Sequence, residues 1–546
     1  MSVLRAPAAS LPWRTTISAL SYDNPYVSVR TPIMARNIVS TSQPLAAQAG
    51  LRMLLAGGNA IDAALAAAIT LTVVEPTGNG LGSDAFAIVW DGNELHGLNA
   101  SGRSPRAWSS ERFRGLSEMP QQGWESVTVP GAISGWAALS ERFGALPFTA
   151  LFEPAIAYAE EGFAVSPSIA LQWSRGADRL RHEPGFAPHF LIEDRVPRSG
   201  EIYRNPHLAR SLRKIADSRG EDFYRGELAR KIADFARQHD AVLDEEDLAA
   251  HACDWCGTIS QPFRGTELHE IPPNGQGIAA LIALGILDRL KLENLDPDSA
   301  ETLHLEIEAM KLALADAHRF VGDPANMEIS PDILLNGDYL DSRAALVDRD
   351  RAADAIAGAP RRGGTVYVTA ADAAGRMVSF IQSNYAGFGS GIVVPETGIH
   401  LQNRGSGFVL APGHPNEVAG GKRPFHTIIP GFLMRGGGPL MSFGVMGGAM
   451  QAQGHLQMVL RTQLWRQNPQ AASDAPRWRF IAGRRVALET GISAEVAAEL
   501  KKMGHQIERV APDADFSFGG AQLIHRLADG YVAGSDHRKD GQAVGF

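Results

Sequence analysis

The sequence predicts a mixed α/β (α+β) fold, and three stretches carry that prediction. Residues 60–74 form a long, alanine-rich apolar run that is typical of a buried helix. Residues 85–90 follow a glycine-dense loop and have the composition of a strand. Residues 365–381 contain two runs rich in β-branched and aromatic side chains, separated by a turn at Gly375, and they predict a β-hairpin.

Composition and charge narrow the class of partner. The chain has 546 residues, of which 45% are hydrophobic and 20% charged, as is usual for a globular protein. Its net charge of −9 and the absence of a Lys/Arg run argue against nucleic acid or an anionic membrane as the partner. The first 26 residues lack a continuous apolar region, and no run of about 18 apolar residues occurs. We therefore expect a cytoplasmic protein with a small-molecule substrate.

The first organised stretch, residues 42–76, predicts two helices. Gly57 and Gly58 end the first helix, and Asn59 caps the second. The loop of residues 78–84 and the strand of residues 85–90 come next. A dinucleotide site needs a strand, then glycines, then a helix, and the order here is helix, glycines, strand. The loop is therefore not a nucleotide-binding loop of that type.

Further helical patterns lie on both sides of the hairpin. We expect helices over residues 132–142, 152–161, much of 207–250, 278–290, 302–320 and 450–464. Residues 207–250 are rich in salt-bridge partners, which indicates a solvated helical layer. None of the residues in the helices at 278–290 and 302–320 need be catalytic.

The chain has two cysteines, Cys253 and Cys256, in a CxxC arrangement. No second pair follows, so a four-sulfur zinc site within one chain is excluded. His251 remains open as a third ligand, and a redox pair remains open as well. A structural or incidental pair is the favoured interpretation. The functional alternative from another class is a non-catalytic or redox protein that uses Cys253 and Cys256.

Thr365 stands at the head of the first hairpin strand, directly after Gly363 and Gly364. A hydroxyl is a weak nucleophile, but cutting the chain just before a threonine frees an α-amine that acts as its base. Two glycines permit the backbone distortion that such a cut needs, and the charged, alanine-rich residues 348–362 form a segment that is able to leave. Local sequence alone also allows a plain loop that enters a strand.

The flanking residues resemble the γ-glutamyltransferase family of N-terminal-nucleophile hydrolases. That family carries a Thr-Thr-His-(Tyr/Phe)-Ser run, then Val-Val-Asp, a glycine turn and a Phe-Gly-(Thr/Ser)-Gly-Ile element. Residues 365–369 (TVYVT), 370–372 (AAD), Gly375 and 388–392 (FGSGI) fall at matching intervals. The resemblance covers nearly the whole chain, and it is nearest to the cytosolic oxamate amidohydrolase-like branch.

This resemblance implies a four-layer αββα sandwich that is made as one precursor, an inactive zymogen. Autoproteolysis between Gly364 and Thr365 would give a large subunit, residues 1–364, and a small subunit, residues 365–546, which are each other's partners. Thr365 would be the nucleophile of this hydrolase or transferase. The chemistry requires no metal and no organic cofactor. A homo-oligomer of the processed pair is left open.

The resemblance also implies the other site residues. Gly447 and Gly448 match the glycines of the family's oxyanion hole, and Thr369 and Ser383 are candidates to hydrogen-bond the Thr365 hydroxyl. Arg103 lies two residues from the place of the family's carboxylate-binding arginine, which is Ser101 here. The remaining candidate substrate-binding residues are Asn384, Tyr385, Arg404, His426 and Thr427. His426 would polarise a substrate carboxylate or satisfy a backbone carbonyl.

Two departures from the family bear on the substrate. Gly407 stands where the family has the acidic residue that holds the substrate's α-amine, and Arg404 adds positive charge nearby. The pocket thus favours a carboxylate without an adjacent amine. We expect an amidohydrolase or acyltransferase acting on a γ-glutamyl compound or a related amide. The alternative is an oxamate amidohydrolase, which converts oxamate to oxalate and ammonia.

Overall fold

The computed structural model describes residues 30–354, 364–512 and 516–546. The N-terminal segment in which an export signal was sought lies outside the described residues. So do Gly363 and residues 355–362 of the segment expected to leave.

One seven-stranded antiparallel sheet carries Thr365. Its strands, in spatial order, are β21 (Gln542–Gly545), β2 (Ile38–Thr41), β10 (Gly364–Ala371), β11 (Met377–Tyr385), β3 (Asp84–Trp90), β4 (Leu95–Ala100) and β7 (Asp254–Trp255). The predicted hairpin is β10 and β11, which pair from Ala371 opposite Met377 back to Gly364 opposite Tyr385. Gly375 turns between them with φ = 90°, a conformation that glycine adopts without strain.

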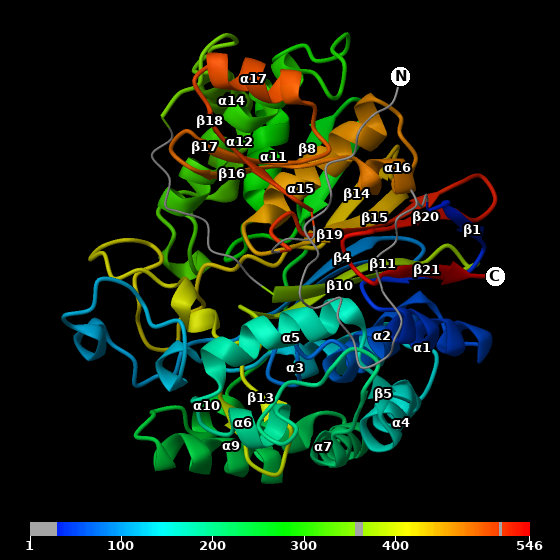
Figure 1. Cartoon of the computed structure of the whole chain (residues 1–546), viewed down its shortest axis with the longest axis vertical. Helices are drawn as coiled ribbons and strands as arrows, with labels where there is room; N and C mark the ends of the chain where they lie inside the picture. The colour runs from blue at the N-terminus through cyan, green and yellow to red at the C-terminus, as the bar shows by residue number, and fades with distance from the viewer. Residues whose placement is uncertain (1–29, 355–363, 513–515) are drawn as a thin grey trace.

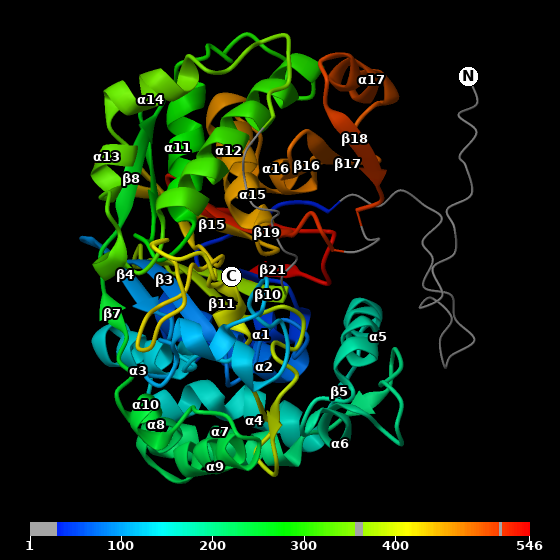
Figure 2. The same cartoon turned by 90° about the vertical axis from the view of Figure 1, so that its left-hand side faces the viewer.

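A second seven-stranded antiparallel sheet packs face to face on the first (Figures 1 and 2). Its strands, in spatial order, are β1 (Ile33–Ala35), β20 (Tyr531–Ser535), β19 (Gly520–Arg526), β15 (Gly438–Met446), β14 (Gly431–Arg435), β9 (Thr266–Glu270) and β8 (Ile259–Phe263). Between the sheets, buried side chains such as Tyr367 and Ile381 from the first sheet meet Phe432 and Ile524 from the second. This apolar interlayer is what holds the two sheets together.

Helices cover both outer faces, which completes the expected αββα order. The alanine-rich α2 (Ala60–Val74) is buried along its whole length against β10 and β11, and α1 (Pro44–Leu55) packs beside it. On the other side, α15 (Met450–Val459) and α11 (Gly277–Asp288) cover β15 and β8, and α12 (Ala300–Phe320) packs outside α11. In Figure 1 the first group lies below the sheets and the second above them.

The remaining α-helices are α3 (Ala132–Phe143), α4 (Glu153–Glu161), α5 (Pro167–Leu180), α6 (Phe186–Phe190), α7 (Pro206–Asp217), α8 (Glu221–Arg225), α9 (Glu227–Gln238), α10 (Glu245–Ala249), α13 (Pro331–Leu334), α14 (Gly337–Ala344), α16 (Pro469–Asp474) and α17 (Ala494–Lys502). Of these, α3 packs on β3 and β4, and α16 packs on β19 and β20. Smaller sheets are formed by β5 (Phe163–Ala164) with β6 (Ile202–Tyr203), by β12 (Val393–Val394) with β13 (Ile399–His400), and by β16 (Trp478–Ala482), β17 (Arg485–Glu489) and β18 (Gln506–Val510).

The helical predictions agree with the structure to within a few residues, and one differs in kind. The stretch predicted as one helix over 450–464 is α-helical only to Val459, and residues 460–464 form a π-helical turn. The predicted cap at Asn59 is present as a capping box with Asp62. No helix within the three described ranges has the length and apolar character needed to cross a bilayer.

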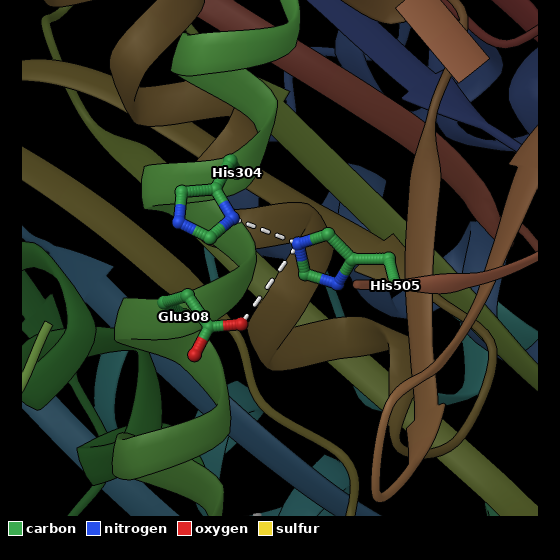
Figure 3. Close-up of side chains that lie close together, drawn as sticks. All are labelled: His304, Glu308 and His505. Atoms are coloured by element: carbon green, nitrogen blue, oxygen red, sulfur yellow. Dashed lines mark hydrogen bonds and ion pairs between the residues drawn. The ribbon is translucent and has the colours of Figure 1, made fainter. Parts of the chain in front are cut away.

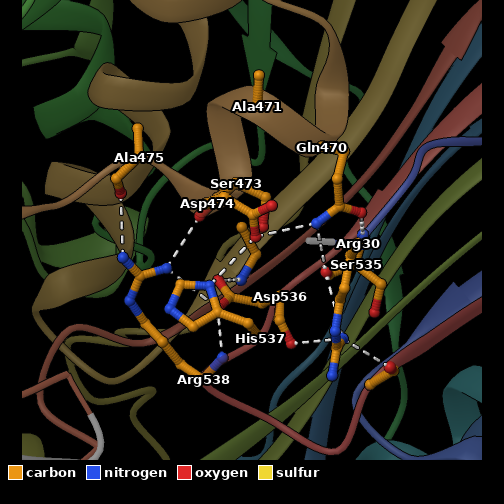
Figure 4. Close-up of polar contacts among 12 residues, drawn as sticks. Arg30, Gln470, Ala471, Ser473, Asp474, Ala475, Ser535, Asp536, His537 and Arg538 are labelled. Atoms are coloured by element: carbon orange, nitrogen blue, oxygen red, sulfur yellow. Dashed lines mark hydrogen bonds and ion pairs between the residues drawn. The ribbon is translucent and has the colours of Figure 1, made fainter. Parts of the chain in front are cut away.

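A buried polar cluster fixes the C-terminal region beside the first sheet (Figure 4). The Asp536 carboxylate accepts hydrogen bonds from Arg477 at 2.5 Å and Arg538 at 3.1 Å. Burial opposes ionisation, but the two guanidinium groups lower the pKa of Asp536 well below its ordinary value. Arg30 donates to the Asp536 carbonyl oxygen at 3.0 Å. The cluster thereby holds β20 and Arg30 close to β21, the edge strand of the sheet that contains Thr365.

Candidate active site

Thr365 is the second residue of β10 and lies in the interior of the molecule, with 4% of its surface exposed. Its Oγ1 lies 3.0 Å from Ser383 Oγ and 3.4 Å from Gln451 Nε2. The β10–β11 register is irregular at this point, because Gly364 faces Tyr385 while Val366 faces Gln382. The pair Val366–Gln382 continues to Thr365 opposite Ser383, so strand pairing brings the two hydroxyls together, and the extra residue of β11 lies just beyond them.

Gln451, near the start of α15, was missed by sequence reasoning. Its Oε1 accepts the Ile429 N–H at 2.9 Å, and its side chain is fully buried. A backbone N–H can only donate, so the amide is oriented with Nε2 as the donor to Thr365. The sequence feature that could have identified Gln451 was its position three residues after Gly448, which places it in the first turn of the predicted helix.

Ser383 connects Thr365 to a buried cation. Its Oγ accepts the Tyr385 N–H at 2.8 Å and lies 3.4 Å from Arg404 Nη2. Thr369 was the second candidate to hydrogen-bond the Thr365 hydroxyl, and the structure contradicts this expectation. Its Oγ1 donates to the Val378 carbonyl or bonds Ser442 Oγ, at 3.0 and 2.6 Å. Four residues along an extended strand place it about 13 Å from Thr365, too far for a hydrogen bond.

Gly447 and Gly448 link β15 to α15, the helix that carries Gln451. Both have positive φ, 125° and 62°, and a Cβ at Gly447 would lie 3.0 Å from Gly519 Cα. Among the described residues, neither N–H has a hydrogen-bond acceptor. Two free backbone donors at a helix start, next to a hydroxyl, form an arrangement that suits a developing oxyanion.

Arg404 supplies buried positive charge behind this hydroxyl. Its side chain is fully buried, donates to Thr427 Oγ1 at 2.8 Å and lies over the Tyr385 ring, with Cζ 4.3 Å from the ring centroid. Burial lowers the pKa of Arg404 to about 10, against the attraction of Asp84, so the group remains a cation at neutral pH. Its charge reaches the site through Ser383 and Thr427.

Two further candidate substrate-binding residues, Tyr385 and Asn384, are adjacent in the chain, but only Tyr385 lines the cavity that Thr427 also lines. Tyr385 has a positive φ of 75°. Asn384 is fully buried, and its Oδ1 accepts from Ser83 Oγ at 2.7 Å. Its main chain bonds Gly78 and Asn403, so Asn384 joins the loops around the hairpin.

His426 takes neither of the two expected roles. Its Nδ1 accepts the Ile428 N–H at 3.4 Å, and its Nε2 therefore donates to Asp84 Oδ2 at 3.1 Å. Burial and the nearby Arg404 keep the pKa of His426 well below its ordinary value, so the ring is neutral. Burial raises the pKa of Asp84 to about 6, although Arg404 and the Gly102 and Gly131 N–H groups oppose the shift. The His426 ring therefore hydrogen-bonds Asp84 and the main chain, and the expectation that it contacts the substrate is wrong.

Arg103 lies at the surface, with 48% of its side chain exposed. It donates to Asp323 Oδ2 at 2.9 Å and to the Gly421 carbonyl at 3.2 Å. Asp323 also accepts the Arg423 N–H at 2.9 Å. Arg103 therefore pins the loop around Gly421 and is not one of the residues that line the cavity beside Thr427.

That cavity has a volume of about 550 Å³, and Thr365 is not among the residues that line it. Its wall includes Tyr385 and Thr427, which contact Arg404, and Ala449, which follows Gly448 directly. Gly407, at the place of the family's acidic residue, also lines it. A Cβ at position 407 would lie 2.7 Å from the Phe425 carbonyl oxygen, so the close approach of these two segments excludes a side chain there.

Two groups of side chains bring potential metal ligands together. His304, Glu308 and His505 are buried, with one ligand atom of each within 4.8 Å of the others (Figure 3). These atoms already have partners: His304 Nδ1 and His505 Nε2 share a hydrogen bond of 2.8 Å, and the Lys311 ammonium lies 2.6 Å from Glu308 Oε1. A cation would have to compete with that ammonium, so the geometry favours a polar network. The second group, Asp91, Glu94 and His96, lies near the β3–β4 turn.

The two cysteines are free thiols. Burial raises the pKa of Cys253, and its Sγ lies 3.8 Å from the Ser134 carbonyl oxygen. A redox cysteine needs a lowered thiol pKa, so this environment disfavours the redox alternative. His251 bonds Ser134 Oγ at 2.9 Å through Nε2 and stacks on Tyr224.

Comparison with known proteins gives a consistent result. Residues 46–546 match the protein-family model described as gamma-glutamyltranspeptidase. The chain is 36% identical over 522 residues to the oxamate amidohydrolase proenzyme of Klebsiella pneumoniae, covering 92% of this chain and 97% of that protein. It is 34% identical over 528 residues to the glutathione hydrolase-like YwrD proenzyme of Bacillus subtilis, covering 95% and 100%.

A solved structure is similar over almost the full length. The crystal structure of cephalosporin acylase from Bacillus halodurans superposes with a TM-score of 0.93 at 45% identity, covering 97% of this chain and 99% of that one. The similarity therefore includes the segments on both sides of Thr365.

Proposed function

Because the chain belongs to the gamma-glutamyltranspeptidase family, we propose that it cuts itself between Gly364 and Thr365 and then hydrolyses or transfers the acyl group of a small carboxylate-bearing amide. The products of the cut are residues 1–364 and 365–546. No metal or organic cofactor is needed for either step.

In the precursor, Thr365 Oγ1 attacks the carbonyl carbon of Gly364. The amide bond to the Thr365 nitrogen breaks, and an ester to Oγ1 forms in its place. Water then hydrolyses the ester, leaving a carboxylate on Gly364 and a free α-amine and hydroxyl on Thr365. The amine so released becomes the general base for the same hydroxyl.

In the mature enzyme, Thr365 Oγ1 attacks the substrate's amide carbonyl. The amine leaves with a proton, and water or an acceptor amine resolves the acyl-enzyme. Gly447 and Gly448 would hold the oxyanion with their N–H groups. Their positive φ values and lack of acceptors among the described residues support this role.

The observation that carries the proposal is the hydrogen bonding of Thr365 Oγ1. Ser383 and Gln451 hold this one hydroxyl at 3.0 and 3.4 Å, next to the glycines of the β15–α15 connection and in front of the Arg404 cation. Donors aimed at a hydroxyl oxygen stabilise negative charge on it. A threonine that only completed a strand would not need them.

For the substrate, we propose a carboxylate without an adjacent amine. Arg404 provides a buried positive charge behind Thr427 and Ser383, and no side chain fits at Gly407 to bind an ammonium group. Oxamate is the specific alternative, and the 36% identity to an oxamate amidohydrolase proenzyme supports it.

Denaturing electrophoresis of wild type and two variants tests self-cleavage. Wild type should give two bands, at about two thirds and one third of the full mass. Thr365→Ala should stay whole because it has no nucleophile, whereas Thr365→Ser keeps a hydroxyl and should still be cut. An active wild-type preparation with an intact bond between residues 364 and 365 would disprove the mechanism.

Product analysis tests the substrate proposal. Wild type is given oxamate and glutathione separately, and ammonia and glutamate are measured. Ammonia from oxamate with little glutamate from glutathione is the expected result. Rapid release of glutamate would show that the missing acidic residue does not exclude γ-glutamyl substrates.

A further inference from the structure

The cavity lined by Tyr385, Thr427 and Ala449 has a polar part, which includes the Glu118 carboxylate, and an apolar part. Val321, which directly follows α12, lines it together with Phe408, Val409 and Phe425. Phe408 is 4% exposed and Phe425 9%, so their rings are packed into the protein and present a fixed surface.

Two polar residues in the wall are already engaged with the main chain. Asn416 donates through Nδ2 to the Gly407 carbonyl at 2.7 Å, and its Oδ1 accepts the Phe425 N–H at 2.8 Å. His414 accepts the Asn416 N–H through Nδ1 and donates through Nε2 to the His318 carbonyl, both at 3.0 Å. Burial lowers the pKa of His318 to about 4, so its ring is neutral. This part of the wall therefore presents no charge to a ligand.

The cavity is continuous with the end of the site that would hold the substrate carboxylate. Thr427 accepts from Arg404, and Tyr385 lies under the same guanidinium. Both residues line the cavity, as does Gly407. A group in the cavity therefore extends from the acyl half of the substrate, the half that bears the carboxylate.

The volume of the cavity indicates how large the group on the acyl half of the substrate is. Cavities of about 300–1,000 Å³ hold drug-sized ligands, and this one measures about 550 Å³. Oxamate, with no apolar part, would leave most of it unfilled. On the basis of the proposed function, we infer that the acyl half of the natural substrate carries an apolar group of ring size next to its carboxylate. The substrate class is then monoamides of aryl- or alkyl-substituted dicarboxylic acids, hydrolysed by water to the diacid and ammonia.

Three matched probes test the inference: malonamate, 2-phenylmalonamate and N-phenylmalonamate. The first has no ring, the second has it on the acyl half, and the third on the amine half. We expect kcat/KM for 2-phenylmalonamate to exceed that for malonamate by about tenfold to a hundredfold, because burial of a phenyl group favours binding by that much. Equal rates, or a preference for N-phenylmalonamate alone, would overturn it.

A pair of valine variants ties the effect to the cavity. Val409→Trp narrows it and should lower the ratio of kcat/KM between 2-phenylmalonamate and malonamate at least severalfold. Val347→Trp, at a half-buried valine that does not line the cavity, should keep the wild-type ratio. Complete self-cleavage of both variants checks that they fold. An unchanged ratio in Val409→Trp would contradict the assignment.

Binding to cleaved wild type separates this inference from the proposed function. By calorimetry, 2-phenylmalonate should bind at least tenfold more tightly than malonate. If no amide is hydrolysed but this difference is found, the proposed reaction fails and the cavity assignment holds. If amides are hydrolysed and the two diacids bind equally, the cavity assignment fails and the proposed reaction holds.

Discussion

At the scale of single residues, the hydroxyl of Thr365 depends on a side chain that no motif pointed to. Gln451 reaches it only because α15 starts beside β10 and because Ile429 fixes the orientation of the amide. Ser383 contributes from the neighbouring strand. The proposed nucleophile is therefore held from two different layers of the sandwich.

Replacing Gln451 tests that contact. Gln451→Leu removes the donor and should lower kcat about tenfold to a hundredfold with little change in KM, because a lost hydrogen bond to a developing charge costs about 1.5–3 kcal/mol. Gln451→Glu keeps an acceptor for Ile429 but offers no amide donor at neutral pH. It should therefore lose kcat similarly, and its melting temperature should fall because the new carboxylate is buried. A wild-type kcat in Gln451→Leu would refute the role.

At the scale of elements, α12 and the small sheet that begins with β16 meet through a buried carboxylate. Trp478 donates through Nε1 to Glu306 Oε2 at 2.6 Å, and Glu306 is 4% exposed. Burial raises the pKa of Glu306 from 4.5 to about 7, although Trp478 and Arg461 oppose the shift. The carboxyl group is thus held mainly in its neutral form at acidic pH.

The raised pKa predicts how stability changes with pH. Glu306 stabilises the fold fully below pH 4.5, and this contribution is lost as pH rises through about 7, because the unfolded chain releases the proton more readily. Relative to Glu306→Gln, wild type should lose up to about 3 kcal/mol between pH 4.5 and 8. Melting temperatures of both proteins across this range measure the difference.

Glu301→Gln is the matched control. Glu301 lies in the first turn of the same helix, and 43% of its side chain is exposed. Its replacement should not reproduce the trend, because that carboxylate remains in contact with water. If the difference in melting temperature between wild type and Glu306→Gln were the same at all pH values, the raised pKa of Glu306 would be contradicted.

At the scale of the whole molecule, both sheets draw strands from both sides of the proposed cut. The first sheet places β10 and β11 between β2 and β3, and the second places β14 next to β9. The strand hydrogen bonds and the interlayer core therefore join residues 1–364 to residues 365–546 throughout the sandwich. Cutting one peptide bond leaves all of these contacts in place.

This arrangement predicts that the two fragments remain together. After complete cleavage, size-exclusion chromatography in native buffer should give one species that contains both bands. Only a denaturant should separate them, because separation requires exposing the core between the sheets. Elution of the two fragments in separate peaks without denaturant would contradict the interleaved topology.

Much of the fold could be read from the sequence because its signals are local. The apolar run of α2, the strand pair around Gly375 and the cap at Asn59 each depend on neighbours within a few residues, and all three are present. The π-helical turn after Val459 was not predicted, since an α- and a π-turn share the same apolar pattern.

The candidate site was only partly predictable, for a related reason. Thr365 and Ser383 lie on one hairpin, so their meeting follows from strand pairing. The predicted hydrogen bond from Thr369 to the Thr365 hydroxyl was wrong, because the two residues lie too far apart along the strand. His426 was wrongly given a role toward substrate or a carbonyl because its partner, Asp84, is far away in the sequence.

The sequence by itself determined the elements, the proposed nucleophile Thr365 and the absence of a carboxylate at position 407, because these are properties of one segment at a time. Only the tertiary structure decided which side chains hold the Thr365 hydroxyl, where Arg404 places its charge and how large the neighbouring cavity is. Those features arise where α15, β10 and the loop after β13 come together, and the packing of distant segments is not encoded in any one of them.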